Sequence, residues 1–387
     1  MSLEIKSYYK TKLPVILAIL LLIPIYILPI WWVSLTAPNY PQESFPDGVK
    51  IHFHAHGVFN GCETMANEEI EELTLDCVHE MDTINHYVGM YPIAAGGPIE
   101  ILISIFLLSM LGVMLLSYLV DDTKKRTATL AAGFTLIAIW FSVVLYAPNG
   151  LKYHHKNFLA GRVVALGEDS ESFDEEMSAA EALIASMKAS LAESGVVVED
   201  EKDEPKSQKE KDIAFLKDAF EANQNSLGIQ EEWNGSGIQL LGWHYRTSLA
   251  RWFNDPEINN PMVNNMVRAA SILFWVIVIT MFGFVYGSRK SNGLINKLLI
   301  LIPISLPALF VIIYAAWLNW YGHNMNSMGA FTLKPFMPTV FGQGKVAQFT
   351  TNSYPHIGFF LMLLSSALLI FAFLSKRNQQ IAKDSEK

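Results

Sequence analysis

The sequence predicts an all-α membrane bundle of six transmembrane helices, with three extracytoplasmic segments of mixed α and β structure. Three observations lead to this fold class. The chain has 387 residues, of which 51% are hydrophobic and only 17% charged, and its mean hydropathy of +0.26 is typical of membrane proteins. Six apolar runs are long enough to cross a hydrocarbon layer of roughly 30 Å as helices. Lysine and arginine gather in alternate connections between these runs.

The apolar runs define the predicted spans. They cover residues 13–35, 99–120, 128–147, 266–287, 298–321 and 357–374. The first run follows three lysines, as a secretory signal would, but it is too long for a signal and lacks a small-residue cleavage site. We therefore expect a retained helix, with Trp31 and Trp32 in the interfacial aromatic belt.

The basic residues predict the orientation, because short loops rich in Lys and Arg stay in the cytoplasm. The tails 1–12 and 375–387 and the turns 121–127 and 288–297 are rich in them. Two of the remaining segments, 36–98 and 322–356, carry only Lys50, Lys334 and Lys345. We therefore expect a bacterial inner-membrane protein with both termini in the cytoplasm. The periplasmic segments would be 36–98, 148–265 and 322–356, and the cytoplasmic parts are too short for a catalytic or nucleotide-binding domain.

The largest outward segment, 148–265, is acidic and contributes much of the net charge of −9. Helical spacing predicts helices at 173–192, where Ser172 and Glu175 form a capping box, and at 212–222. The polar run 199–211 between them is typical of a solvated linker. The acidity indicates a solvated surface, and a docking site for a basic partner is the alternative.

The two cysteines lie in the same outward segment, at Cys62 and Cys77. Outside the cytoplasm an even pair favours a disulfide, which would stabilise the fold by roughly 3 kcal/mol in the chain-entropy model. Residues 66–75 between them are expected to form a short acidic helix. Metal binding by the two thiols is the alternative interpretation.

Histidines are the candidate metal ligands. His52, His54 and His56 alternate with apolar residues in the stretch IHFHAH, which is the period of a strand. Same-face residues of a strand are roughly 6.6 Å apart, so two imidazoles could share a metal but three would be strained. A solvent-facing strand edge without metal is the alternative.

A second candidate site combines histidine and methionine from four predicted helix ends at one outer rim. The ligand set would favour copper, and an amphipathic interface without metal is the alternative. The candidate ligands are His86, Met90, His154, His155, His323, Met325 and Met328. No histidine lies in the middle of a predicted helix and there is no Cys-x-x-Cys-His, which argues against haem at the bilayer centre and against the usual covalent haem attachment.

Three short blocks carry a family resemblance. They are Trp31–Pro41, Ile84–Met90 and Phe331–Gly342. In these blocks the chain resembles the NosB-like multi-spanning membrane proteins associated with the clade II type of nitrous oxide reductase. The resemblance implies a role in nitrous oxide respiration and denitrification, by docking the periplasmic copper enzyme, maturing it or supplying it with electrons. It implies no catalytic residue, and an accessory subunit rather than an enzyme.

Two other functions remain open from the residues alone. One is a membrane redox protein that uses haem or quinone. The other is a small-molecule or ion transporter, which is disfavoured because the spans carry no charge apart from Glu100 and Arg268 near helix ends. Small residues in the spans permit a homodimer or a larger complex without requiring either. Copper is the only cofactor that the pattern suggests.

Overall fold

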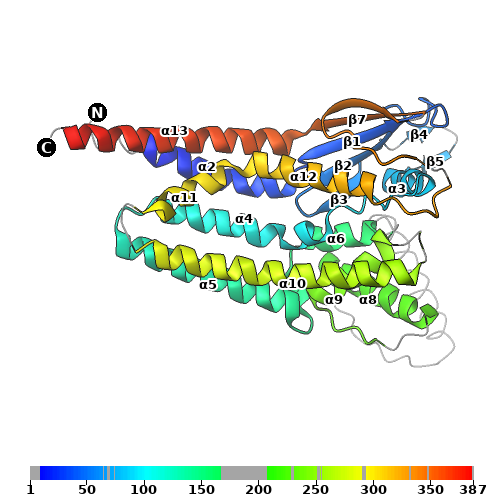
Figure 1. Ribbon diagram of the computed structural model, residues 1–387, viewed down its shortest axis with the longest axis horizontal. Coiled ribbons are helices and arrows are strands. Elements are labelled where there is room, and N and C mark those ends of the chain that lie inside the picture. The colour runs from blue at the N-terminus through cyan, green and yellow to red at the C-terminus, as the bar shows by residue number, and fades with distance from the viewer. Residues whose placement is uncertain are drawn as a thin grey trace, which may run out of the picture.

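Apolar helices and a small antiparallel sheet make up the protein (Figure 1). A computed structural model describes residues 9–63, 65–67, 70–73, 75–166, 207–227, 231–250, 253, 255–289, 293–330, 333–346 and 348–385. Five helices of the described chain are long and apolar enough to cross a membrane, or six if one bent pair counts as a single span. The five are Tyr9–Ile27, Pro98–Tyr118, Thr123–Tyr146, Pro256–Gly287 and Ile357–Gln379.

The long helices are α2 (Leu13–Ile27), α4 (Pro98–Tyr118), α5 (Thr123–Tyr146), α10 (Pro256–Gly287) and α13 (Ile357–Ser385). Helix α2 packs on α13 and α4, and α5 packs on α4 and α10. The two chain ends lie together at one end of this bundle, and the sheet lies at the other (Figure 1). The start of α5 is tied to the end of α10, because Thr127 Oγ1 and Ser288 Oγ are hydrogen-bonded at 2.9 Å.

The bent pair consists of α11 (Leu294–Ile304) and α12 (Leu306–His323), which meet at an angle of 63°. Pro303 and Pro307 flank the break at Ser305. Each proline removes a backbone donor and crowds the preceding turn, which is a common cause of a sharp helix kink. The sequence predicted one span over 298–321, and the structure divides it into these two helices. Helix α11 packs on both α4 and α13, and α12 packs on α13.

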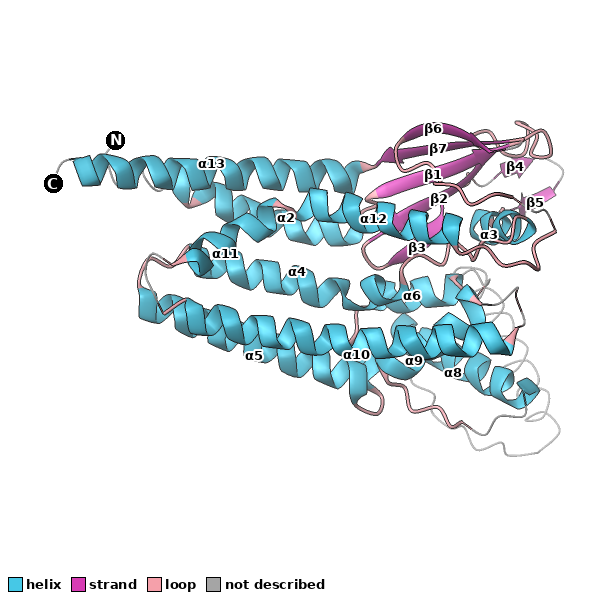
Figure 2. Ribbon diagram, viewed as in Figure 1, coloured by secondary structure: helices cyan, strands magenta, loops and turns pink. Residues whose placement is uncertain are grey.

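The main sheet has five antiparallel strands in the order β3-β2-β1-β7-β6. Figure 2 shows them gathered at one end of the bundle. The strands are β1 (Trp31–Thr36), β2 (Val49–His54), β3 (Gly57–Asn60), β6 (Gly342–Val346) and β7 (Phe349–Pro355). One face of the sheet is apolar, and it packs on α12 and on α3 (Cys77–Tyr87) through Trp31, Val33, Ile51, Met81 and Tyr314.

The first span is shorter than expected. The predicted helix over 13–35 ends at Ile27, and residues 31–36 form the central strand β1. Pro29 stops the helix, and the aromatic and β-branched residues that follow suit a strand. Trp31 is therefore 2% exposed in the core rather than in an aromatic belt, and its Nε1 donates to Ser353 Oγ at 2.8 Å.

Smaller elements complete the end of the bundle that carries the sheet. The helices are α6 (Lys156–Val164), α8 (Gln208–Leu227) and α9 (Gly237–His244), with a 3-10 turn at Gly150–Tyr153 and a π-helical turn at Tyr245–Leu249. A hairpin of β4 (Met65–Asn67) and β5 (Ile70–Leu73) occupies the place where a helix over 66–75 was expected. That expectation was wrong.

Other boundaries also differ from the sequence prediction. Helix α10 begins ten residues before the predicted span at 266, and α13 continues eleven residues beyond 374. The helix expected at 212–222 is α8, which extends further at both ends. The helix expected at 173–192, its capping box Ser172–Glu175 and most of the linker 199–211 lie outside the described residues.

Candidate functional site

The stretch IHFHAH is a strand only up to His54, and His56 lies in the turn that follows β2. Two of its imidazoles cap the first span. His54 Nδ1 lies 2.9 Å from the Ile27 carbonyl and His56 Nδ1 lies 2.9 Å from the Tyr26 carbonyl. A carbonyl only accepts, so each Nδ1 carries the proton and donates it. The last carbonyls of a helix lack partners within the helix, and these two histidines supply them.

His54, His56 and His155 form a row of neighbouring rings, which we call the histidine row. The ring centroids of His54 and His56 are 5.1 Å apart, and those of His56 and His155 are 6.5 Å apart. Tyr26 lies against His56 and His155, at 5.3 and 5.1 Å. A separate pair is formed by His52 and His356, whose centroids are 5.2 Å apart.

Burial keeps these rings neutral. It lowers the pKa of His52 and of His56 to about 4, with the neighbouring imidazoles as a further cause. Burial also lowers the pKa of His54, His155 and His356. Neutral imidazole is the form that ligates metals, but with Nδ1 of His54 and of His56 engaged, only Nε2 of each ring is left for other partners.

The two loops that were expected to hold copper do meet, through backbone rather than through ligands. The Asn326 amide donates to the Gly89 carbonyl at 2.7 Å. Gly89 has a φ of +79°, and a Cβ there would lie 2.5 Å from the Asn326 carbonyl oxygen. A Cβ added at Gly329 would likewise lie 2.5 Å from the Gly89 amide nitrogen. Only glycine permits this approach at a positive φ.

The candidate copper ligands themselves face different surroundings. His86 lies against Phe253 at 5.4 Å, and Met90 is 3% exposed within the bundle core. His323 is bonded to its own helix through the Asn319 carbonyl, while Met325 packs on the core and Met328 is 53% exposed.

His154 is buried apart from these residues. Its ring lies 4.0 Å from Phe158, and Nε2 donates to the Leu102 carbonyl at 3.0 Å. Across the described part of the chain, no group of three or more His, Cys, Asp or Glu is arranged to hold a metal ion.

Cys62 and Cys77 are joined by a disulfide, with Cα atoms 6.0 Å apart. The bridge ties the end of β3 to the first residue of α3, and the Asp76 carboxylate caps that helix by accepting from Val78 and His79 amides. The β4–β5 hairpin lies within the closed loop. The thiols are thus structural and are not available to a metal.

A cavity of about 390 Å³ lies between the bundle and the sheet. It is lined by α4 and α12, with further walls from α2, β2, α10 and α13. Before the 63° bend at Ser305, α11 packs on α4 and α13, whereas α12 after it packs on α13 and α11. The cavity lies between α12 and α4. Leu107, Leu309 and Ile313 line it and are also 38–44% exposed, so it reaches the outer surface of the helices. The volume falls within the roughly 300–1,000 Å³ typical of small-molecule sites.

The walls of the cavity are almost entirely apolar, with a few polar groups at the end near the sheet. Glu100 is the only carboxylate among the lining residues, and they include no Lys or Arg. Trp317 Nε1 donates to Glu100 Oε1 at 2.9 Å, whereas Oε2 is buried without a hydrogen bond to another described residue. Tyr321 Oη donates to the Gly96 carbonyl at 2.9 Å, which fixes the loop that leads into Glu100.

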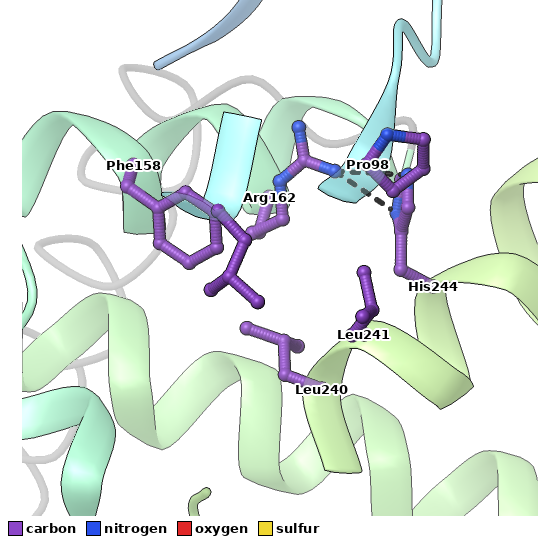
Figure 3. Close-up of a pocket in the computed structure, with 7 residues that line it drawn as sticks. Pro98, Phe158, Arg162, Leu240, Leu241 and His244 are labelled. Carbon is purple, nitrogen blue, oxygen red and sulfur yellow. Dashed lines mark hydrogen bonds between the residues drawn. The ribbon is translucent and has the colours of Figure 1, made fainter. Parts of the chain in front are cut away.

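A second buried charge lies behind this end of the cavity. Arg162 on α6 is 3% exposed, and its Nη1 lies 2.9 Å from Nε2 and 3.2 Å from Nδ1 of His244 on α9 (Figure 3). The small space that both residues line, with Phe158 and Pro98, is about 10 Å³, near the lower limit for one water molecule. Within the described residues Arg162 forms no ion pair with a carboxylate.

Burial governs the electrostatics of this second group. It lowers the pKa of the Arg162 guanidinium to about 10, and it lowers the pKa of His244 far below its usual value, with the Arg162 charge adding to the effect. Burial raises the pKa of Tyr245, and the Glu100 carboxylate raises it further, while the Arg162 charge lowers it. Tyr245 therefore lies within electrostatic range of both charges.

Sequence reasoning noticed Glu100 only as a charge near a helix end and missed Arg162, His244 and Tyr245. For Glu100 and Arg162 the sequence did contain a signal, an isolated charge beside apolar residues. Glu100 follows GGP and precedes an uninterrupted apolar run, and Arg162 lies in the apolar stretch FLAGRVVAL. A single charge in such surroundings is expensive to bury and is often functional. The sequence could not show that the segments carrying Glu100 and Arg162 lie close together in the fold.

Comparisons with known proteins add no family to this description. No protein-family model, curated protein or solved structure matches the chain.

Proposed function

We propose that the protein is the membrane partner of a periplasmic copper enzyme, and that the enzyme is nitrous oxide reductase. The partner would dock the reductase, help to mature it or deliver electrons to it. One observation carries the proposal: all strands of the described chain, together with helices α3, α6, α8 and α9, lie at one end of the bundle, opposite the chain ends (Figure 2). Such an arrangement offers a folded platform to a soluble protein on one side of the membrane only.

The topology that we propose has six spans, with α11 and α12 forming one bent span. Both termini would lie in the cytoplasm of a bacterial inner-membrane protein, and the sheet would lie in the periplasm. The basic turns before α5 and after α10 support this orientation. Cysteines introduced one at a time at Asp122 and at Gln348 test it. A membrane-impermeant maleimide added to intact cells should label only position 348, and labelling of position 122 alone would reverse the orientation.

The platform has an exposed apolar patch suited to protein contact. Phe341 is 67% exposed and Met337 is 45% exposed, on the segment that leads into β6. The aromatic ring of Phe341 lies on those of Trp31 and Tyr354, so it is held in place at the surface. Rigid exposed aromatic side chains are typical anchors of protein interfaces. Two blocks of the family resemblance, Trp31–Pro41 and Phe331–Gly342, meet at this patch.

Affinity purification from mild detergent tests the function. We expect the tagged protein to retain a copper-containing periplasmic reductase, and Phe341→Asp to lose it. Tyr153→Asp is the control, because Tyr153 is a comparably exposed aromatic residue (63%) in a different part of the chain. Recovery of no reductase with the unmodified protein, under conditions where the protein stays folded, would reject the proposal.

A quinone-binding redox protein is the second candidate function. The observation that favours it is the apolar cavity with Glu100 at its polar end.

A further inference from the structure

We propose that the cavity between α4 and α12 binds the ring of an isoprenoid quinol, with a ring hydroxyl donating to Glu100. The proposal concerns binding alone and stands independently of the partner enzyme. It follows from the access, shape, wall chemistry and polar end of the cavity.

Access suits a molecule dissolved in the lipid. The mouth is formed by Leu107 on α4 and by Leu309 and Ile313 on α12, all of which are partly exposed on the outside of the helices. A ligand could therefore enter sideways from the bilayer without crossing water. An apolar tail would remain among the lipids while the ring lies inside.

The walls suit a flat aromatic ring. Phe53, Phe310, Tyr314, Trp317 and Tyr321 all contribute to the lining. Phe310 and Tyr314 are nearly parallel, with an interplanar angle of 8° and centroids 6.0 Å apart. Aromatic rings gain from such stacked and edge contacts beyond the burial of their area. A saturated acyl chain would be stabilised only by the burial of its apolar surface.

The polar end offers acceptors rather than donors. Oε2 of Glu100 lacks a hydrogen bond to any other described residue, and the indole N–H of Trp317 is already directed at Oε1. His54 also lines the cavity, and because its Nδ1 donates to the Ile27 carbonyl, its Nε2 is an acceptor. A quinol carries a hydroxyl donor at each end of its ring. A quinone carries only acceptors and would fit less well.

The same chemistry disfavours a phospholipid headgroup. A phosphate needs a cation or several donors in a dry site, and the lining residues include neither Lys nor Arg. The carboxylate of Glu100 would repel it. A quinol is neutral, so its binding brings no additional charge into the cavity.

Equilibrium dialysis of the full-length protein in detergent tests the proposal. Menadiol, kept reduced under nitrogen, is the probe, and menadione is its oxidised counterpart. We expect menadiol to bind more tightly than menadione, and Glu100→Gln to weaken menadiol binding about tenfold, as loss of a charge-assisted hydrogen bond does. Glu100→Gln keeps an oxygen for the Trp317 indole, so the fold has a partner at that position.

Two neighbouring substitutions on α12 provide a matched pair. Ile313→Trp places a larger ring in the cavity mouth and should abolish menadiol binding. Ile312→Trp, on a side chain that is 63% exposed and outside the lining, should leave it unchanged. This pair decides the matter even where Glu100→Gln fails to fold.

Extraction of the purified protein adds an independent arm. A long-chain quinone should be found with the unmodified protein and with Ile312→Trp, and should be absent from Ile313→Trp. Phospholipid alone, lost on Ile313→Trp, would mean that the cavity holds an acyl chain and would overturn the proposal. Failure of menadiol to bind at all would also overturn it. Because capture of the reductase is measured separately, either outcome leaves the proposed partner function to its own test.

Discussion

Trp317 on α12 donates its indole N–H to the carboxylate of Glu100 at the start of α4, over 2.9 Å. This hydrogen bond joins segments 217 residues apart in the sequence. It holds the carboxylate at the polar end of the cavity and links the bent helix to α4 where the two have separated.

Trp317→Phe should therefore cost more stability than Glu100→Gln. The first change leaves a buried carboxylate with no donor, which typically costs about 1–3 kcal/mol or more for a charged group. The second keeps the hydrogen bond and removes the charge. The midpoints of thermal unfolding in detergent, followed by intrinsic fluorescence, compare the two. Equal midpoints would mean that the indole hydrogen bond does not stabilise the fold.

Gly89→Ala should destabilise the end of the molecule that carries the sheet. The substitution puts a side chain at a positive φ and within 2.5 Å of the Asn326 carbonyl oxygen, so the two loops would have to separate. A cost of about 1–3 kcal/mol is typical of strain of this kind. Gly283→Ala is the control, since no atom lies within 4 Å of the added Cβ. Limited proteolysis should find new cleavage near residues 324–330 only in the Gly89 variant.

Stability should fall as the pH drops from about 6.5 to about 4, partly because of His154. Its ring donates from Nε2 to the Leu102 carbonyl and accepts at Nδ1 from the His155 amide, so the neutral ring is fully bonded. Burial lowers the pKa of His154 to about 4. The unfolded chain therefore takes up its proton near pH 6.5, before the folded chain does, and the stabilisation is complete above that pH and lost as the pH falls toward 4.

A depression of this size corresponds to roughly 3 kcal/mol for so deeply buried a ring. Unfolding midpoints between pH 7.5 and 4.5 measure it. His154→Gln should make the profile shallower without flattening it, because burial also lowers the pKa of His52 and of His56 to about 4. An unchanged profile in the variant would exclude His154 as a cause.

Arg162 and His244 should respond differently to substitution. Arg162→Met removes a buried charge that has no carboxylate partner in the described part of the chain, and replacing a buried ion by an apolar residue of similar size is often neutral or stabilising. His244→Phe leaves the guanidinium without its ring partner and should cost roughly 2–4 kcal/mol. The double variant should regain most of that loss. If His244→Phe costs the same in both backgrounds, the two side chains are not coupled.

The disulfide should stabilise the packing of α3 on the sheet rather than the helix bundle. Cys62→Ser with Cys77→Ser opens a loop whose ends are 15 residues apart, which costs roughly 3 kcal/mol in the chain-entropy model. We expect a lower unfolding midpoint and faster proteolysis between β3 and α3, with helix content by circular dichroism nearly unchanged. A general loss of helix would instead mean that the bundle depends on the bridge.

The apolar helices could be recognised from the sequence because the signal for each one is local. Twenty apolar residues have to be helical in a membrane whatever their neighbours are. The sheet could not be recognised in this way. Its central strand β1 continues an apolar run, and the partner strand β7 begins only at Phe349, more than 300 residues later in the sequence. Only IHFHAH had a strand pattern, and even there His56 lies past the end of the strand.

The candidate site was largely out of reach for the same reason. Residues 86–90 and 323–328 were expected to share a rim, and the structure brings the two loops together, but glycine and backbone hold them together rather than His86 and His323. The cavity depends on the helix break at Ser305. The sequence shows the prolines beside this break, but it does not show in which direction the helix bends. Glu100 and Arg162 were visible as isolated charges, and their setting became clear only with α6, α9 and α12 in place.

The sheet also constrains the order of events during synthesis. Strand β1 leaves the ribosome with the first helix, whereas β7, which pairs with it along its whole length, comes just before the last helix. At roughly 5–20 residues per second, one edge of β1 waits on the order of tens of seconds for its partner. Exposed edge strands invite aggregation. A chain shortened before residue 349 would therefore leave that edge open permanently, and we expect chaperones to hold every nascent copy until its final helix has been made.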